Sequence, residues 1–138
     1  MSPPKVVFDT NILISAYFFG GQPRIALDIA RGGKVILLQN NETVAEFVRV
    51  LGYRKFGLTA DEIKPLVEDL LGFSEKVSLG TPVKYIKEDP TDNIFLTLAR
   101  QGQAKYIVSG DAHLLNIKSF SGIDILTVRR FLSRFGKL

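Results

Sequence analysis

Short apolar runs alternate with amphipathic stretches along the chain. The run Val6-Val7-Phe8, which ends at Asp9, is typical of a strand covered on both faces. By the same reasoning strands are predicted at 5–9, 35–38, 106–109 and 123–126, with weaker extended candidates at 77–79 and 83–86. Apolar residues at helical spacing predict helices at 12–18, 24–31, 42–51, 59–73, 92–101, 112–115 and 128–135.

Polar residues at the starts of these helices suggest caps. We predict helix caps at Asn41, Thr59, Thr91 and Thr127, because these side chains can accept a hydrogen bond from a free backbone N–H. Thr59 and Glu62 have the spacing of a capping box. Pro65 would cost this helix a backbone hydrogen bond, so a kink or a later start is expected there.

Strands separated by helices indicate an α/β fold with a central parallel sheet of about four to five strands. In such sheets ligands bind outside the carboxyl ends of the strands. Asp9 and Asp111 each follow a predicted strand, so they are expected to lie at the same edge of the sheet.

Composition narrows the class of protein. The 138 residues, 46% of them hydrophobic and 23% charged, suit one globular domain over residues 1–138. No apolar stretch approaches the roughly 20 residues that cross a bilayer, and the pattern of a secretory signal peptide is lacking, so no membrane association is expected. With no cysteine and one histidine, thiolate and multi-histidine metal sites are excluded and a cytoplasmic location is expected.

The formal net charge of +4 has two interpretations. Four basic residues crowd the last ten positions without an acidic partner among them: Arg129, Arg130, Arg134 and Lys137. They could attract a polyanion such as nucleic acid, or simply complement the dipole of a C-terminal helix.

Four acidic residues stand where an α/β chain can bring distant side chains together: Asp9, Glu46, Asp92 and Asp111. Carboxylates that converge repel one another unless a cation lies between them, and oxygen ligands suit Mg²⁺ better than zinc. This pattern favours metal-dependent hydrolysis of a phosphodiester bond. Thr10 and Asn11 are weak ligands, so they are expected to hold Asp9 in place or to bind a metal-bound water.

Each acid also has a simpler explanation. Asp9, Asp92 and Asp111 could cap or begin helices, and Glu46 could pair with Arg49 on a solvated helix face. Competing acids lie close by in the sequence: Glu42, Glu88 and Asp89. The single histidine, His113, is expected to be a surface or capping residue. No glycine-rich phosphate loop or hydrolase triad is present.

Four segments, in order along the chain, resemble the acidic motifs of the PIN-domain nucleases. They are Val6 to Ser15, Glu42 to Phe47, Asp89 to Leu96 and Val108 to Leu115. The chain is most similar to the small stand-alone group described as toxins of toxin–antitoxin pairs, the VapC-like proteins.

The resemblance implies a three-layer α/β/α fold and a Mg²⁺- or Mn²⁺-dependent endoribonuclease. It implies Asp9, Glu46, Asp92 and Asp111 as catalytic residues, the three aspartates as metal ligands, and Asn11 and Ser109 as polar supports. It further suggests a homodimer, with Ile12 to Phe19 and Thr59 to Phe73 as candidate interfaces, and a cognate antitoxin. Position 113, often an acid in this motif, is His113 here, which puts a second metal site in doubt.

Two alternatives stay open. A PIN-like module could bind RNA or a protein with little turnover, and metal-dependent cleavage would distinguish this from a nuclease. A phosphoryl-transfer domain could use Asp9 as a covalent nucleophile, but the sequence has no Asp-x-Asp at the first strand and no lysine in an obvious late-strand position.

Overall fold

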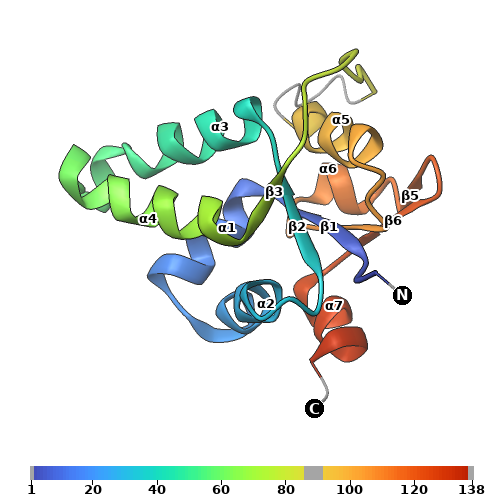
Figure 1. Ribbon diagram of the computed structural model, residues 1–138, viewed down its shortest axis with the longest axis horizontal. Helices are drawn as coiled ribbons and strands as arrows, with labels where there is room; N and C mark the ends of the chain where they lie inside the picture. The colour runs from blue at the N-terminus through green and yellow to red at the C-terminus, as the bar shows by residue number, and fades with distance from the viewer. Residues whose placement is uncertain (1, 86–91, 137–138) are drawn as a thin grey trace.

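A sheet crosses the middle of the molecule in the computed structural model, which describes residues 2–85 and 92–136 (Figure 1). Within those ranges the sheet has six strands in the order β3-β2-β1-β4-β6-β5. In that order they are Ser74–Lys76, Ile36–Gln39, Lys5–Phe8, Tyr106–Val108, Ile123–Leu126 and Ser119–Phe120. All neighbours pair in parallel except β5, which is antiparallel to β6.

Helices connect the strands. They are α1 (Thr10–Phe18), α2 (Gly21–Arg31), α3 (Asn41–Leu51), α4 (Ala60–Phe73), α5 (Asn93–Gln101), α6 (Ala112–Leu115) and α7 (Val128–Phe135), with the 3₁₀ turn η1 (Arg54–Phe56) between α3 and α4. Among the described helices, none has both the length and the apolar character required to cross a membrane.

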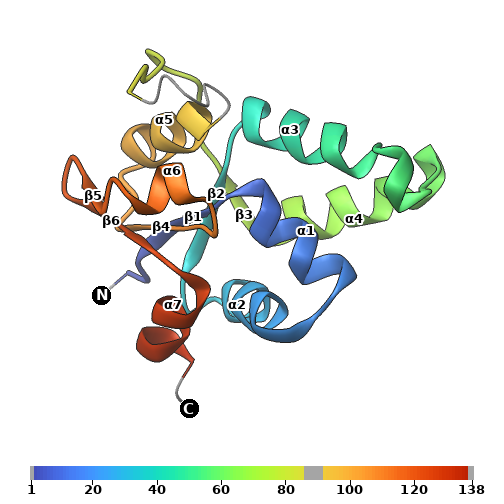
Figure 2. The same cartoon turned by 180° about the vertical axis from the view of Figure 1, so that it is seen from behind.

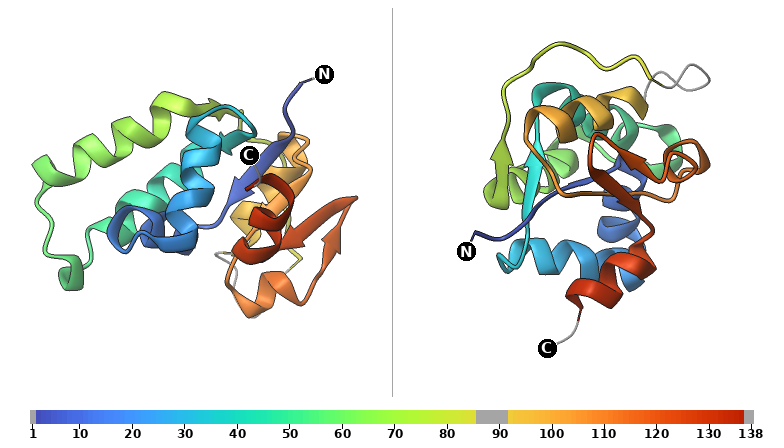
Figure 3. Two further views of the ribbon diagram at one scale, coloured as in Figure 1. Left: turned by 90° about the horizontal axis from the view of Figure 1, so that it is seen from below. Right: turned by 90° about the vertical axis from the view of Figure 1, so that its right-hand side faces the viewer.

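The sheet separates two apolar cores, because successive side chains of a strand point to opposite faces. Val6 and Phe8 of β1 pack with α1, α2, α3, α4 and α7, where Phe131 meets Phe8 edge to face. Val7 packs in the second core with side chains of α5 and α6. Figures 2 and 3 show α2 and α7 on one side of the sheet, and α5 and α6 on the other. The predicted three-layer α/β/α architecture is therefore confirmed.

The expected strands differ from those observed at the two edges of the sheet. Neither weak candidate forms a strand over its described residues, 77–79 and 83–85, and the edge strand β3 lies immediately before the first of them, at Ser74–Lys76. β5 was not expected, since it has only two residues and forms through the turn at Ser121-Gly122, where both φ angles are positive. The sheet thus has one or two strands more than predicted.

Most predicted helix starts are confirmed, with three corrections. The helix predicted from 24 begins at Gly21, because Pro23 lies in the first turn of α2, where its missing N–H would have no partner within the helix. The cap of α3 is Asn40 rather than Asn41, because the Asn40 carboxamide accepts a hydrogen bond from the backbone of Thr43. The capping box of Thr59 and Glu62 is present, and α4 begins at Ala60, so Pro65 does not delay the helix. Thr127 caps α7 as expected. The proposed cap Thr91, the end of the candidate strand at 86, the competing acids Glu88 and Asp89, and Lys137 lie outside the described residues.

The expected dimer surface at Ile12 to Phe19 is mostly covered within the chain. Ile12, Leu13 and Ile14 belong to the first core, whereas Phe19 is 76% exposed. The homodimer stays a prediction, and so does the single domain.

Candidate metal centre

The carboxyl ends of β1 and β4 place Asp9 beside Ser109. Phe8 is in register with Val108, and the backbone N–H of Asp9 donates to the carbonyl of Val108 at 3.1 Å. The Ser109 hydroxyl donates to Oδ2 of Asp9, while Oδ1 accepts from the backbone N–H of Ile12 at 2.9 Å. Asp9 therefore caps α1 with one carboxylate oxygen and contacts the next strand with the other.

Burial raises the pKa of the Asp9 carboxyl group. Only 3% of the residue is exposed, and loss of hydration raises its pKa from 3.8 to about 6. The hydrogen bond from Ser109 opposes this pKa shift, whereas the charge of Asp111 adds to it. A bound cation would stabilise the ionised form of such a buried carboxylate, so Asp9 is suited to be a metal ligand.

Asp111 is connected to Asp9 through Ser109. The backbone N–H of Asp111 donates to the Ser109 hydroxyl oxygen at 2.9 Å, and that hydroxyl in turn donates to Asp9. Ser109 is completely buried, so this short chain of bonds fixes the spacing of the two carboxylates.

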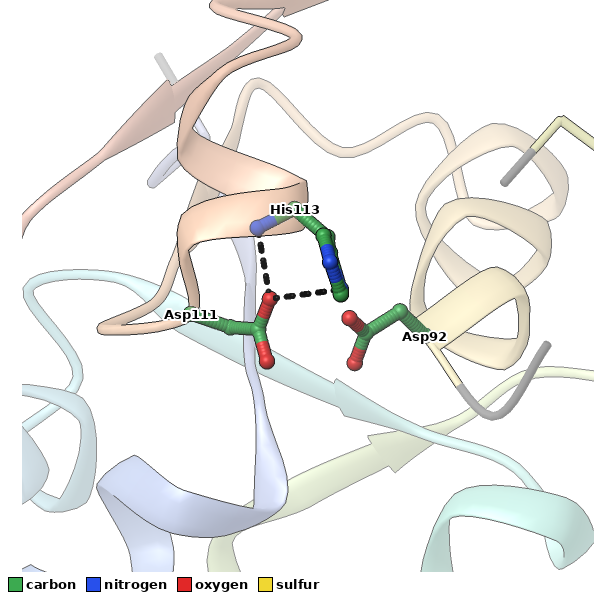
Figure 4. A group of neighbouring side chains, drawn as sticks. All are labelled: Asp92, Asp111 and His113. Carbon is green, nitrogen blue, oxygen red and sulfur yellow. Dashed lines mark hydrogen bonds and ion pairs between the residues drawn. The ribbon is translucent and has the colours of Figure 1, made fainter. Parts of the chain in front are cut away.

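The Asp92 carboxylate faces that of Asp111, and the His113 ring lies beside both (Figure 4). One ligand atom from each of the three residues lies within 4.8 Å of the others. Asp111 caps α6 by accepting from the backbone N–H of His113 at 2.7 Å, and the His113 Nδ1 lies 3.7 Å from the same oxygen. This close group includes His113, whereas Asp9, predicted as a ligand, does not belong to it.

Glu46 is held by Arg49, as the simpler explanation of this acid expected. Two guanidinium nitrogens of Arg49 bond the two carboxylate oxygens at 3.0 and 2.6 Å. Arg49 also donates to the Tyr53 hydroxyl at 2.5 Å. The carboxylate is mostly covered and the guanidinium mostly exposed, so Glu46 carries a positive partner at the entrance to the site.

All four predicted acids line one pocket of about 190 Å³. Its walls are Asp9, Thr10, Asn11, Glu46, Arg49, Val50, Asp92, Phe95 and Asp111. Segments that are far apart in the sequence thus converge: Asp9 and Asp111 follow strands, Asp92 precedes α5, and Glu46 lies within α3.

The polar groups of this pocket fit a hard divalent cation. Asp9, Asp92 and Asp111 provide carboxylate oxygens, which is the ligand type that Mg²⁺ and Mn²⁺ prefer. The Thr10 hydroxyl is buried and, among the described residues, has no hydrogen-bond partner. A buried hydroxyl without a partner is costly, and a metal-bound water would satisfy it.

The predicted supporting residues differ in position. Ser109 contacts Asp9 directly, whereas Thr10 and Asn11 are not among the described residues that hydrogen-bond its carboxylate. The sequence did not place Arg49 or Phe95 in the pocket. His113 is exposed, as expected, and it also lies near Asp92 and Asp111. The signal for His113 was its position two residues after Asp111 at a strand-to-helix turn.

Comparison with known proteins adds to this geometry. A sequence model described as "PIN domain" matches residues 5–113, which contain all four acids. The chain belongs to the PIN domain family. PIN domains are generally metal-dependent nucleases, and the acidic pocket of this chain is compatible with that chemistry.

A solved structure agrees on the fold of this PIN domain. It is the crystal structure of PAE2754 from Pyrobaculum aerophilum, which aligns over 99% of this chain and 98% of its own. The TM-score is 0.59 and the sequence identity 15%, so the similarity supports a shared fold and nothing finer. No curated protein matches the sequence.

Proposed function

We propose that this PIN domain is a Mg²⁺- or Mn²⁺-dependent endoribonuclease that hydrolyses RNA phosphodiester bonds. The observation that carries the proposal is the convergence of Asp9, Glu46, Asp92 and Asp111 on one pocket. A group of acids with two buried members, Asp9 and Asp92, is costly by itself and becomes favourable around a divalent cation.

Three aspartates would hold the cation: Asp9, Asp92 and Asp111. A bound divalent cation lowers the pKa of a water and stabilises negative charge on the phosphate oxygens. Ser109 orients Asp9 through its hydrogen bond, and Asp111 is oriented by the backbone N–H of His113. Thr10 can accept or donate a bond to a water in the pocket.

Glu46 and Arg49 would act together on substrate. Glu46 can orient a water, provided that Arg49 moves away or shares its bonds. Arg49 can bond a phosphate oxygen of the RNA, because a guanidinium matches phosphate as well as carboxylate.

The biological role that we propose is the toxin of a toxin–antitoxin pair, acting as a cytoplasmic homodimer with a cognate antitoxin. This part rests on the resemblance of the four acidic motifs to VapC-like proteins. Purification with its neighbouring gene product, followed by mass measurement of the complex, would test the antitoxin and the dimer together.

Cleavage of a mixed, end-labelled RNA pool tests the enzymatic proposal. We expect cleavage with Mn²⁺ or Mg²⁺ that is lost in EDTA and in Asp9→Asn, and retained in Asp124→Asn, which alters an exposed acid on β6. Products should carry 5′-phosphate and 3′-hydroxyl ends. Ends with 2′,3′-cyclic phosphate would refute the mechanism, because they require attack by the 2′-hydroxyl of the RNA itself.

One observation favours a second candidate, a PIN module that binds RNA or protein with little turnover. Glu46, predicted to be catalytic, forms an ion pair with Arg49, which donates two hydrogen bonds to its carboxylate. Intact RNA together with no Mn²⁺ binding by calorimetry would support this module over the nuclease.

A further inference from the structure

A groove of about 700 Å³ adjoins the acidic pocket. The two share Asn11, Glu46 and Val50, so the groove starts where the acidic pocket ends. Its remaining walls come from α1 and from the segment that follows α3: Ile14, Ser15, Phe18, Phe19, Tyr53, Lys55 and Phe56. Figure 2 shows α1 lying beside α3, with the chain continuing from α3 toward α4.

Aromatic rings are unusually exposed along this groove. Phe19 is 76% exposed and Tyr53 39%, although a ring of this size normally gains from burial. Phe18 and Phe56 stack face to face in the wall of the groove, with ring centroids 4.8 Å apart. The exposed ring of Phe19 lies beside this pair, with its centroid 6.4 Å from that of Phe18.

Positive charge accompanies the rings. The Lys55 ammonium lies 5.2 Å from the centre of the Phe56 ring, and the Arg49 guanidinium lies 5.5 Å from the centre of the Tyr53 ring. Exposed aromatic faces interleaved with cations are the combination by which proteins bind single-stranded nucleic acids, because bases stack on the rings and phosphates pair with the cations.

We propose that this groove binds the single-stranded RNA next to the cleaved bond, with unpaired bases stacked on Tyr53 and Phe19 and a phosphate paired with Lys55. The proposal rests on the proposed nuclease function, since the shared wall places these residues beside the acidic pocket. A strand that occupies the groove extends into the pocket through Asn11 and Glu46. Duplex RNA offers no free base faces for stacking, so unpaired segments are the expected substrate.

A second copy of the chain is the other occupant that exposed rings could attract. The basic residues beside the rings favour RNA, because its phosphates complement the charges of Arg49 and Lys55. The test below includes the oligomeric state for this reason.

Steady-state cleavage of a short unstructured RNA would be compared for the parent and for Tyr53→Ala, Tyr53→Phe, Phe19→Ala and Lys55→Gln. Loss of a stacking ring should raise KM by about fivefold or more, whereas Tyr53→Phe, which keeps the ring, should stay within about twofold of the parent. Lys55→Gln should raise KM and weaken the dependence of KM on salt. The matched controls are Tyr85→Ala, an exposed ring that packs on Phe120, and Lys64→Gln on α4.

A second readout does not require turnover. RNA carrying 2-aminopurine beside the cleavage site, mixed with protein and Ca²⁺, should lose fluorescence on binding to the parent and to Tyr53→Phe, and should keep it with Tyr53→Ala. Gel filtration of each variant would report the oligomeric state at the same concentrations.

The outcomes separate the two proposals. Unchanged KM and unchanged fluorescence in Tyr53→Ala and Phe19→Ala, with cleavage intact, would overturn the groove proposal and leave the nuclease proposal standing. Equal losses in Tyr53→Phe and Tyr53→Ala would also overturn it, because the effect would then come from the hydroxyl that holds Arg49. If the parent shows no metal-dependent cleavage, the nuclease proposal fails, and the fluorescence result alone decides for or against RNA in the groove. A change of mass in Phe19→Ala without a change in KM would assign the surface to self-association and overturn the proposal.

Discussion

Asp9→Asn should make the metal-free protein more stable at neutral pH. Asn can accept from the backbone of Ile12 as Asp9 does and can donate to the Ser109 hydroxyl, so the capping geometry is kept while the buried charge is removed. Most single substitutions lower stability, so an increase would identify Asp9 as a carboxylate whose charge destabilises the folded protein.

The magnitude follows from the pKa of Asp9, which burial raises from 3.8 to about 6. The folded protein therefore binds this proton more tightly than the unfolded chain, and stability falls as pH rises between these two values. Above about pH 7 the ionised carboxylate costs about 3 kcal/mol, and near pH 4 the cost is below about 1 kcal/mol. For a chain of this length, 3 kcal/mol corresponds to a rise in Tm of about 10 °C.

Thermal or urea unfolding of the parent and of Asp9→Asn in EDTA, from about pH 4 to pH 8, measures this difference. Asp124→Asn, at an exposed position, is the matched control and should follow the parent at every pH. Mn²⁺ at about a thousand times its Kd should reverse the order of stability, because it adds about 4.1 kcal/mol to the parent alone, which exceeds the cost of the ionised carboxylate. A stability difference that does not vary with pH, or an equal gain in Asp124→Asn, would refute the reasoning.

Three further predictions concern the neighbours of Asp9 and the core. Ser109→Ala removes a hydrogen bond that favours the ionised form of Asp9, so the pH of half-maximal Mn²⁺ binding should rise. Calorimetry across a range of pH would measure this midpoint, and an unchanged midpoint would contradict the prediction. Arg49→Gln removes a positive charge from the pocket wall and should tighten Mn²⁺ binding several-fold by calorimetry while weakening RNA binding. Phe131→Ala should lower the free energy of unfolding by about 3–5 kcal/mol in urea, because the ring is fully buried against Phe8.

The sequence was most informative where local patterns and tertiary packing agree. β1 and β4 are continuous apolar runs covered on both faces, so their position and the acids that follow them were predictable. β3 was misplaced because its residues, Ser74–Lys76, are polar and join the sheet only at its edge, by pairing with β2. The two residues of β5 are too few to produce a periodic pattern.

The convergence of the four acids on one pocket was predictable, whereas their contacts were less so. The positions of Asp9 and Asp111 at strand ends follow from topology, whereas Glu46 and Asp92 depended on the family resemblance. The remaining contacts depend on side-chain geometry. Arg49 forms two hydrogen bonds with Glu46, and His113 lies near Asp92. The spacing of residues along the chain does not determine the rotamers that make these contacts. The competing explanations also proved to be compatible, since Asp9 and Asp111 cap helices and line the pocket at once.

The bond between Ser109 and Asp9 joins residues that are 100 positions apart, across two strands that pair in parallel. Such contacts form late, because a long loop must close before the pairing stabilises it. A ribosome that has synthesised only the first hundred residues therefore holds a chain with Asp9 and Glu46 but without Asp111 or the strand that positions Ser109. The acidic pocket is unable to form until β4 and the residues that follow it have been synthesised and have paired with β1.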